Sequence, residues 1–578
     1  MDNQDIARVF EEIAALLEIK GANPFKIRAY RNASETVSTM GERVSDLSAE
    51  ALLAIPGIGK DLAARIRELS ETGVLTYHQE LLEVYPATLL DLLTLQGLGP
   101  KTVALLYETR GIKTLGELEE AARAGHLDGV RGLGPKKQAL ILRAIDEQQR
   151  RTGRHLIADA RAAATAVISH LAAQYPQGRF HAVGSLRRGC ETCGDVDILR
   201  VDVDADAHDR FVSFPRVERI LGYGDTKSSI LLRDGIQIDL RVVQAESEGA
   251  AMQYFTGSKP HNIALRDRTT QRGFKLNEYG LFRVSDGVAV ASRTEQEIYA
   301  ALELDLIPPE LRENLGEIAA AESGTLPNLA TRESIRDDLH SHTTATDGQA
   351  DIETMARAAM AAGLDYLAIT DHSQALAMAN GLDETRALKH AAAIREVDAR
   401  LTEITVLAWI ECDILADGRL DLSEECLAQL DIVIASVHSA FGQDESQMTE
   451  CILKAIESPV VDIVGHPTGR LLLRREPYRV NVERLVDAAA KHGVALEINS
   501  QAHRLDLNDA HARLARDRGV KLVVSSDSHT PESFKLLEWA VLVARRAWLQ
   551  PTDVLNTLPV EVLRASLRRN RPQEEHIG

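Results

Sequence analysis

Acidic residues spaced for metal binding lie in the first half of the 578-residue chain. The segment DVDIL places Asp195 and Asp197 two positions apart, and residues i and i+2 of a strand share one face. A second strand-like run, IQIDLRV, carries Asp239. Three carboxylates that converge from adjacent strands can hold two divalent ions ~3.5–4 Å apart, and oxygen ligands suit Mg²⁺ or Mn²⁺. Such a metal pair activates a hydroxyl nucleophile and stabilises a pyrophosphate leaving group.

A glycine-rich segment, GSLRRGCETCG, lies immediately before these aspartates. Its backbone N–H groups, hydroxyl and guanidinium groups are donors suited to a triphosphate. The candidate nucleotide-binding residues in it are Gly184, Ser185, Arg188 and Gly194. A solvated DxD pair on an edge strand is the plainer interpretation of the aspartates, but it does not account for this segment. Cys190 and Cys193 lack a second cysteine pair for zinc, and we interpret them as incidental.

Histidines concentrate in the second half, where eleven of the 18 lie after residue 331. Those in HSH, TDH, SVH, GHP and SDSH follow strand-like runs, and α/β folds assemble their sites at the carboxyl ends of strands. Any single histidine is more often structural than a ligand, but so many at strand ends by chance is improbable. The candidate ligands are His340, His342, Asp347, His372, Glu411, His438, His466, Asp527 and His529. They suffice for up to three ions such as Zn²⁺ or Mn²⁺, which promote phosphoester hydrolysis.

Three similar turns, IPGIGK, LQGLGPK and VRGLGPKK, occur in the first 150 residues. Their regular spacing marks an internal repeat. Such a turn between helices directs backbone N–H groups toward a phosphate oxygen without reading base sequence. A single copy is most often a plain connector, whereas three copies favour DNA binding. The candidate DNA-contacting residues are Gly57, Gly59, Lys60, Gly97, Gly99, Lys101, Gly132, Gly134 and Lys136.

The elements that must position these residues change in type along the chain. Residues 1–150 are rich in Ala, Leu, Glu and Arg, which predicts short helices. Residues 178–245 alternate like short strands, and residues 250–310 mix helix and strand. Gly, Pro and Ser at 320–336 indicate a linker. Beyond it, strand-like runs alternate with helical stretches, which predicts a βα barrel or a related α/β fold.

The bulk composition narrows the class of protein. Hydrophobic residues make up 44% and charged residues 26%, which is typical of a globular protein, and the length implies several domains. No apolar run approaches the ~20 residues that cross a bilayer, and the acidic N-terminus lacks the pattern of a signal peptide. With five scattered cysteines, we expect a cytoplasmic, nucleoid-associated protein without a membrane partner. The net charge of −20 does not exclude DNA, because phosphates respond to local patches.

The first half, about residues 1–318, resembles the family X DNA polymerases such as polymerase beta. The resemblance is carried by the three glycine turns, the GS-RRG segment, the aspartates and YFTGS at 254–258. It implies an α-helical helix-hairpin-helix region, an α+β nucleotidyltransferase palm and two-metal nucleotidyl transfer. It further implies a nucleotide-binding site that includes Tyr254 and Phe255 at the sugar, Gly257, and Asn262 at the base, with Arg266 on the template strand.

Two residues depart from that family. Arg65 stands where animal relatives carry the lysine that forms a Schiff base with an abasic sugar. A guanidinium cannot form that imine, so the lyase activity is not expected of this residue, and Lys60 nearby is a poor substitute. Gln237 stands where relatives carry an arginine that orients the third aspartate. Because glutamine adds no charge, we expect weaker polymerisation or a shift toward Mn²⁺.

The second half, about residues 335–570, resembles the polymerase-and-histidinol-phosphatase (PHP) domain, because it keeps all nine ligand positions. A polymerase half followed by a PHP half is the order of bacterial family X DNA polymerases. The resemblance implies filling of short gaps during base excision repair, together with a 3′–5′ exonuclease or phosphoesterase that processes DNA ends. The implied partners are gapped or primer-template DNA and deoxynucleoside triphosphates, bound by a monomer.

The resemblance also implies domain boundaries along this multidomain chain. The expected domains are a helical lyase-like DNA-binding domain (1–80), a helix-hairpin-helix fingers subdomain (81–153), the palm (154–245), a nucleotide-binding thumb (246–318), a linker (319–336) and a PHP domain with a distorted barrel (337–578). Two other hypotheses stay open: a phosphoesterase of small molecules with an incidental N-terminal half, and a DNA-end-binding scaffold with an inert polymerase half.

Overall fold

The computed structural model describes residues 3–39, 44–53, 57–93, 98–114, 153–201 and 207–567, with isolated residues at 55 and between 117 and 142. Contacts divide the chain into two compact units, Met1–Gly153 and Arg154–Gly578. No described helix is both long and apolar enough to span a bilayer.

The first unit is helical, as predicted. Its first core is shared by α1 (Asn3–Ile19), α2 (Pro24–Thr39), α3 (Ala49–Leu53), α4 (Lys60–Thr72) and α5 (Thr76–Val84). A second core lies between α6 (Thr88–Leu93) and α7 (Pro100–Arg110). Gly59 and Gly99 are extended N-cap residues of α4 and α7, so the first two glycine turns each lead directly into a helix N-terminus.

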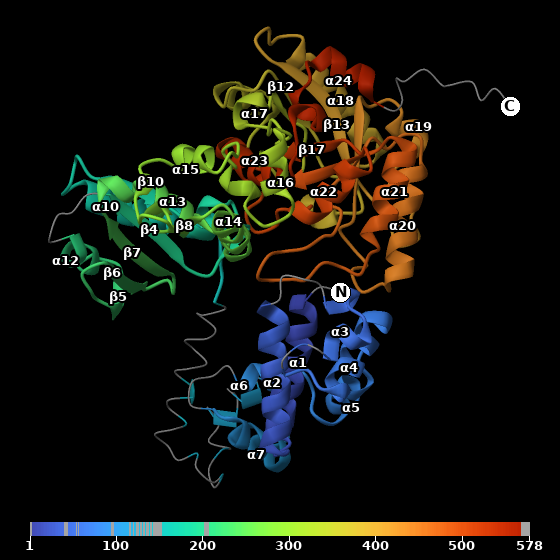
Figure 1. The fold of residues 1–578 in the computed structure, drawn as a ribbon. Coiled ribbons are helices and arrows are strands. Elements are labelled where there is room, and N and C mark those ends of the chain that lie inside the picture. The colour runs from blue at the N-terminus through green and yellow to red at the C-terminus, as the bar shows by residue number, and fades with distance from the viewer. Residues whose placement is uncertain are drawn as a thin grey trace. The chain divides into compact units, whose positions relative to one another are not determined.

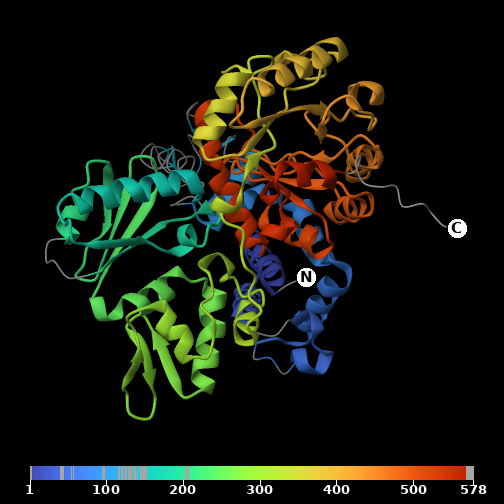
Figure 2. The same ribbon diagram turned by 90° about the horizontal axis from the view of Figure 1, so that it is seen from above.

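The palm is a five-stranded sheet in the order β2-β4-β7-β6-β5. The strands are β2 (Arg179–Ala182), β4 (Val196–Val201), β5 (Val217–Gly222), β6 (Lys227–Leu232) and β7 (Gln237–Val243). Helix α10 (Ile157–Ala172) runs along the sheet (Figure 2). The short α11 (Gly184–Arg187) precedes β4. Val196 and Ile198 are buried in the same core as α10, as the alternation of polar and apolar residues predicts.

A smaller lobe follows the palm. It contains α13 (Glu248–Thr256), α14 (Lys259–Gln271), α15 (Glu295–Ala301), α16 (Glu317–Ser323) and a sheet of β8 (Phe274–Asn277), β9 (Gly280–Arg283) and β10 (Ala289–Ala291). Part of the expected linker, 319–336, is firmly packed. Leu329 and Ala330 are buried, and the Ala330 N–H donates to the Leu549 carbonyl at 2.9 Å. Within the second unit, this segment therefore packs against the C-terminal barrel, whereas a free linker would permit many arrangements.

The C-terminal part is a nearly closed barrel of seven parallel strands in chain order, which confirms the predicted fold (Figure 1). The strands are β11 (Asp337–Asp338), β12 (Tyr366–Ile369), β13 (Thr405–Asp413), β14 (Ile432–Ser436), β15 (Ile463–Val464), β16 (Ala495–Asn499) and β17 (Leu522–Ser525). A bridge from Ser341 to Ser528 joins the first and last strand ends. Helices on the outside include α17 (Ile352–Ala361), α18 (Glu384–Asp398), α20 (Glu445–Glu457), α21 (Val482–His492), α22 (Asp509–Asp517) and α23 (Leu537–Arg546).

Two candidate metal centres

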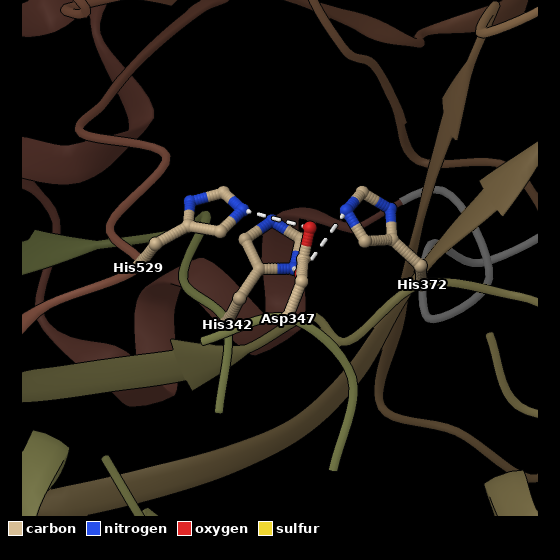
Figure 3. A group of neighbouring side chains, drawn as sticks. All are labelled: His342, Asp347, His372 and His529. Atoms are coloured by element: carbon tan, nitrogen blue, oxygen red, sulfur yellow. Dashed lines mark ion pairs between the residues drawn. The ribbon is translucent and has the colours of Figure 1, made fainter. Parts of the chain in front are cut away.

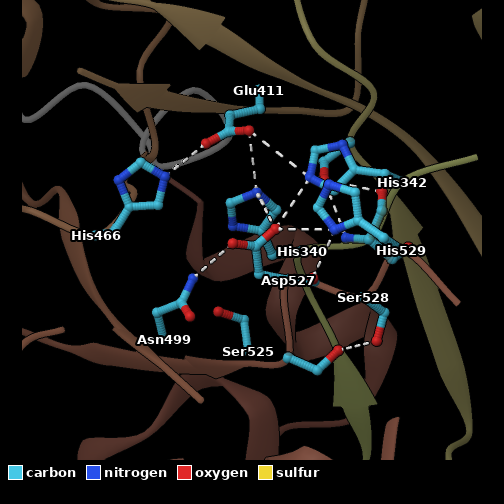
Figure 4. Close-up of polar contacts among 12 residues, drawn as sticks. His340, His342, Glu411, His466, Asn499, Ser525, Asp527, Ser528 and His529 are labelled. Carbon is cyan, nitrogen blue, oxygen red and sulfur yellow. Dashed lines mark hydrogen bonds and ion pairs between the residues drawn. The ribbon is translucent and has the colours of Figure 1, made fainter. Parts of the chain in front are cut away.

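The nine predicted ligands of the second half come together at the carboxyl end of the barrel. Figure 4 labels six of them: His340, His342, Glu411, His466, Asp527 and His529. Glu411 lies near the carboxyl end of β13 and the other eight follow strands. Parallel strands deliver their carboxyl ends to one face of a barrel, which explains why the ligands meet. Eight of the nine fall into three overlapping groups whose ligand atoms lie within 4.8 Å of one another. The groups are His342, Asp347, His372 and His529 (Figure 3); His340, His342 and Asp527; and His372, Glu411 and His438. The ninth, His466, lies with its Nε2 3.0 Å from Oε1 of Glu411.

Glu411 is the centre of this site, and five imidazoles surround its carboxylate. Oε2 lies 2.9 Å from Nδ1 of His372, 3.3 Å from Nε2 of His340 and 3.7 Å from Nε2 of His342. Oε1 lies 3.4 Å from Nε2 of His438. Burial raises the pKa of Glu411, but the imidazoles overcome it and hold the pKa well below its usual value. A carboxylate so surrounded would help to hold metal ions together with these imidazoles.

Buried imidazole nitrogens show that the residues fit metal ions. Nε2 of His340 and both ring nitrogens of His342 are buried and make no hydrogen bond of regular geometry among the described residues, although a carboxylate oxygen lies 3.3 Å from each Nε2. A buried polar atom without a partner is costly, and a metal ion satisfies it. Burial and the neighbouring histidines lower the pKa of His342 to about 4, so its imidazole stays neutral, which is the form that binds metal.

Carboxylates behind the ligands orient them, and the sequence did not single them out. Oε1 of Glu497 lies 2.7 Å from Nδ1 of His340, and its other oxygen accepts the backbone N–H of His466. Oδ1 of Asp413 lies 2.7 Å from Nδ1 of His438. A carboxylate on one ring nitrogen fixes the tautomer that presents the other nitrogen to a metal. Both acids stand near strand ends, in ALEINS and ECD, which is the only sequence signal for them.

The three predicted palm carboxylates form a second group. β4 pairs in parallel with β7, and this register places Asp197 directly opposite Asp239. Asp195, Asp197 and Asp239 offer ligand oxygens within 4.8 Å of one another. Burial, with the charges of Asp195 and Asp239, raises the pKa of Asp197 to about 6. Three carboxylates held this close repel one another, and divalent cations relieve that repulsion, so this site also fits metal ions.

Charge at Asp239 is balanced by a residue that the sequence did not indicate. Nζ of Lys227 on β6 lies 2.5 Å from Oδ2 of Asp239, while Nε2 of Gln237 donates to Oδ1 at 3.1 Å. Gln237 therefore makes the hydrogen bond, and Lys227 supplies the positive charge that the glutamine lacks.

A cavity of about 510 Å³ opens beside the aspartates. It is lined by Gly184, Ser185, Arg188, Asp195, Asp197, Tyr254, Phe255, Thr256, Gly257, Lys259, Asn262 and Arg266. The structure thus brings together all the predicted nucleotide-binding residues except Gly194, and it adds Lys259, which the sequence did not indicate. Gly184 has φ +65°, and a Cβ there would lie 2.6 Å from Oδ2 of Asp197. Only glycine permits this close approach of the backbone to the carboxylates.

The first unit places Lys60 and Lys101 at the first turns of α4 and α7. The guanidinium of Arg65 lies 4.2 Å from the ring centroid of Tyr77 and 3.2 Å from Asp61. The remaining predicted DNA contacts, Gly97, Gly132, Gly134 and Lys136, lie outside the described residues.

Comparisons with known proteins match both halves. Family models match as helix-hairpin-helix domain (residues 1–75), SAM-like helix-hairpin-helix tandem (89–147), DNA polymerase beta palm (157–221), DNA polymerase beta thumb (251–313) and PHP domain (338–501). The chain is 36% identical over 574 residues to the DNA polymerase/3′-5′ exonuclease PolX of Bacillus subtilis, which covers 99% of this chain and 100% of that protein.

Shorter proteins resemble the C-terminal part alone. A "probable phosphatase" of Thermoanaerobacter sp. is 31% identical over 231 residues, which is 38% of this chain and 89% of that protein. A "probable phosphatase" of Shewanella sp. is 29% identical over 236 residues, which is 39% of this chain and 89% of that protein.

Proposed function

The chain belongs to the family X DNA polymerases that carry a C-terminal PHP domain, and we propose that it fills short gaps in DNA during repair and trims DNA ends with its second centre. Its activity is that of a DNA polymerase with a 3′–5′ exonuclease, and its substrates are DNA and deoxynucleoside triphosphates. One observation carries the proposal. A single chain holds two separate centres, one of three carboxylates beside a nucleotide-sized cavity and one of nine histidines and acids.

In the palm, Asp195, Asp197 and Asp239 would hold two Mg²⁺ or Mn²⁺ ions. When bound, such ions activate the 3′-hydroxyl and stabilise the departing pyrophosphate. Ser185 and Arg188 line the cavity where they can donate to the triphosphate, and Tyr254 and Phe255 would lie against its sugar. Arg188 is preorganised for this role, because its Nε binds Glu313 at 2.9 Å and its Nη1 donates to the Thr256 carbonyl at 2.5 Å.

In the barrel, the nine ligands would hold up to three Zn²⁺ or Mn²⁺ ions. Bound there, the ions supply hydroxide and polarise the scissile phosphodiester. Glu497 and Asp413 keep His340 and His438 in the tautomers that bind metal. For cleavage, the DNA strand must also place its 3′ end at the carboxyl end of the barrel.

Outside the two centres, we propose that the chain contacts the DNA backbone and acts as a monomer. Lys60 and Lys101 would contact DNA phosphates from the glycine turns, and Arg266 would contact the template strand.

The test is turnover of a one-nucleotide-gapped DNA with a labelled primer in Mn²⁺. Wild type is compared with Asp195→Ala/Asp197→Ala and with His340→Ala/His342→Ala. We expect the first variant to lose extension but keep primer shortening, and the second to do the reverse. A wild type that only shortens the primer would favour an inert polymerase half that serves as a DNA-binding platform. Turnover of small phosphate esters without any action on DNA would favour the small-molecule phosphoesterase.

A further inference from the structure

Beside the histidine centre, two loops bring four cationic or basic side chains together. The first loop continues from His466 and carries Arg474 and Arg475. The second continues from β16 and carries His503 and Arg504. The N–H of Leu472 donates to the carbonyl of His503 at 2.7 Å, which joins the loops. We name these four residues the basic rim.

The basic rim is fixed to the metal centre through Gln501 and Asn499. Nε2 of Gln501 donates to the carbonyl of Asp527 at 3.0 Å and to that of Ser526 at 2.8 Å. Nδ2 of Asn499 donates to Oδ2 of Asp527 at 3.1 Å (Figure 4). The second loop therefore begins on a candidate metal ligand, and the first loop continues from another, His466.

No ion pair among the described residues neutralises the arginines of the basic rim. Within the part of the chain that the structure describes, Arg474, Arg475 and Arg504 have no carboxylate within 4.0 Å, although Arg470 in the same loop pairs with Glu191 at 2.6 Å. Nε of Arg504 is buried without a hydrogen-bond partner among the described residues. Burial and the positive charge of Arg504 lower the pKa of Arg475. Like charges gathered without an acid attract an anion.

Contacts within the protein hold the guanidinium of Arg475 in place without a ligand. Its guanidinium lies 4.4 Å from the ring centroid of Phe441, and its Nη2 donates to the carbonyl of Gly469 at 2.7 Å. Phe441 in turn stacks on Tyr478 with 6.1 Å between centroids. Gly469 has φ +59°, and a Cβ there would lie 2.3 Å from the Tyr478 ring, so the loop requires glycine. A preorganised guanidinium loses little conformational freedom when it binds an oxyanion.

We propose that Arg474, Arg475 and Arg504 bind the phosphodiester backbone of the DNA strand whose 3′ end enters the histidine centre. Guanidinium groups match phosphate oxygens in geometry and charge, and such contacts fix a strand without reading its bases. The assignment rests on the proposed exonuclease function and deepens it. A small phosphorylated molecule has no further phosphates for the basic rim to hold, so the rim selects polymers.

The test uses the full chain and measures exonuclease kinetics on a short single-stranded oligonucleotide, without nucleotides, over a range of salt concentrations. The variant is Arg474→Gln/Arg475→Gln/Arg504→Gln. We expect at least a tenfold rise in KM with little change in kcat. The salt dependence of log KM should fall by roughly 2, because each phosphate contact on a single strand contributes ~0.7. A matched control, Arg357→Gln/Arg400→Gln/Arg419→Gln, removes the same charge from exposed arginines that already pair with Glu353 or Asp417.

A second substrate, bis(p-nitrophenyl) phosphate, presents one phosphodiester and no strand. We expect the basic-rim variant to hydrolyse it as fast as wild type, since the ligands are untouched. Unchanged KM and salt dependence on the oligonucleotide would overturn the assignment. So would an equal loss on both substrates, because the arginines would then support the metal centre rather than a strand. A wild type that cleaves the small diester but not DNA would instead overturn the exonuclease function itself.

Discussion

Arg546 of the barrel and Arg188 of the nucleotide cavity bind the same carboxylate oxygen. Nη1 of Arg546 lies 3.0 Å and Nε of Arg188 lies 2.9 Å from Oε1 of Glu313. Nη1 of Arg546 also donates to the carbonyl of Arg188 at 3.0 Å. Asp509 anchors Arg546 from the other side at 2.8 Å. Helix α23 of the PHP domain therefore holds in place a residue that lines the polymerase cavity.

Arg546→Met should weaken nucleotide binding by the palm, because Glu313 and the Arg188 backbone lose their shared partner. We expect the KM for the incoming nucleotide to rise about tenfold, which corresponds to roughly 1.4 kcal/mol, with a smaller change in kcat. Single-nucleotide insertion kinetics measure this. Arg161→Met is the control, since Arg161 pairs with Glu538 of the same helix at 2.6 Å without contacting Arg188. An equal rise in both variants would mean that loosening of the interface, and not Arg188, is responsible.

Lys227→Met should shift the acid limb of polymerase activity to higher pH. Asp197 has a raised pKa of about 6 from burial and from Asp195 and Asp239, and Lys227 is one of the charges that oppose the rise. Removing that charge raises the pKa further, and a protonated carboxylate binds metal poorly, so activity near pH 6–7 should fall while activity at pH 8 is better kept. Lys227→Arg keeps the charge and should keep the profile. A pH–rate profile in which Met and Arg variants coincide would contradict this role.

The metal ligands could be predicted from the sequence because the position of each depends on the strand that it lies on or follows. Asp195 and Asp197 are two residues apart, so the two-residue period of a strand puts them on one face. His372 and His438 follow parallel strands, whose carboxyl ends meet at one end of the barrel. Partners on other strands could not be predicted in this way. Lys227 reaches Asp239 only through the β6–β7 register, and Glu497 reaches His340 across the barrel. The packing of Ala330 on Leu549 likewise depends on folded contacts that Gly, Pro and Ser content does not reveal.

Glu497→Gln should weaken metal binding at the histidine centre. The carboxylate contacts Nδ1 of His340 and the backbone N–H of His466, and an amide would lose charge and present the wrong group to one of them. We expect the Mn²⁺ concentration for half-maximal exonuclease activity to rise about 10- to 100-fold, the usual effect of removing such a partner. Glu483→Gln, on the exposed face of α21, is the control, and polymerase activity should be unchanged in both. Exonuclease titrations that coincide for the two variants would show that Glu497 does not tune the site.

Because residue 65 is an arginine, we expect the wild-type chain to form no Schiff base with an abasic site. A guanidinium cannot form the imine, and the Arg65 side chain, which is 17% exposed, contacts Tyr77 and Asp61. Borohydride trapping on abasic DNA should give no covalent adduct with wild type. An adduct that disappears in Lys60→Ala would contradict this and assign the chemistry to Lys60. Arg65→Lys supplies an amine at the same place and should gain an adduct. That adduct should form slowly at neutral pH, because an ammonium beside Asp61 keeps its proton, and faster as the pH rises toward the pKa of the amine.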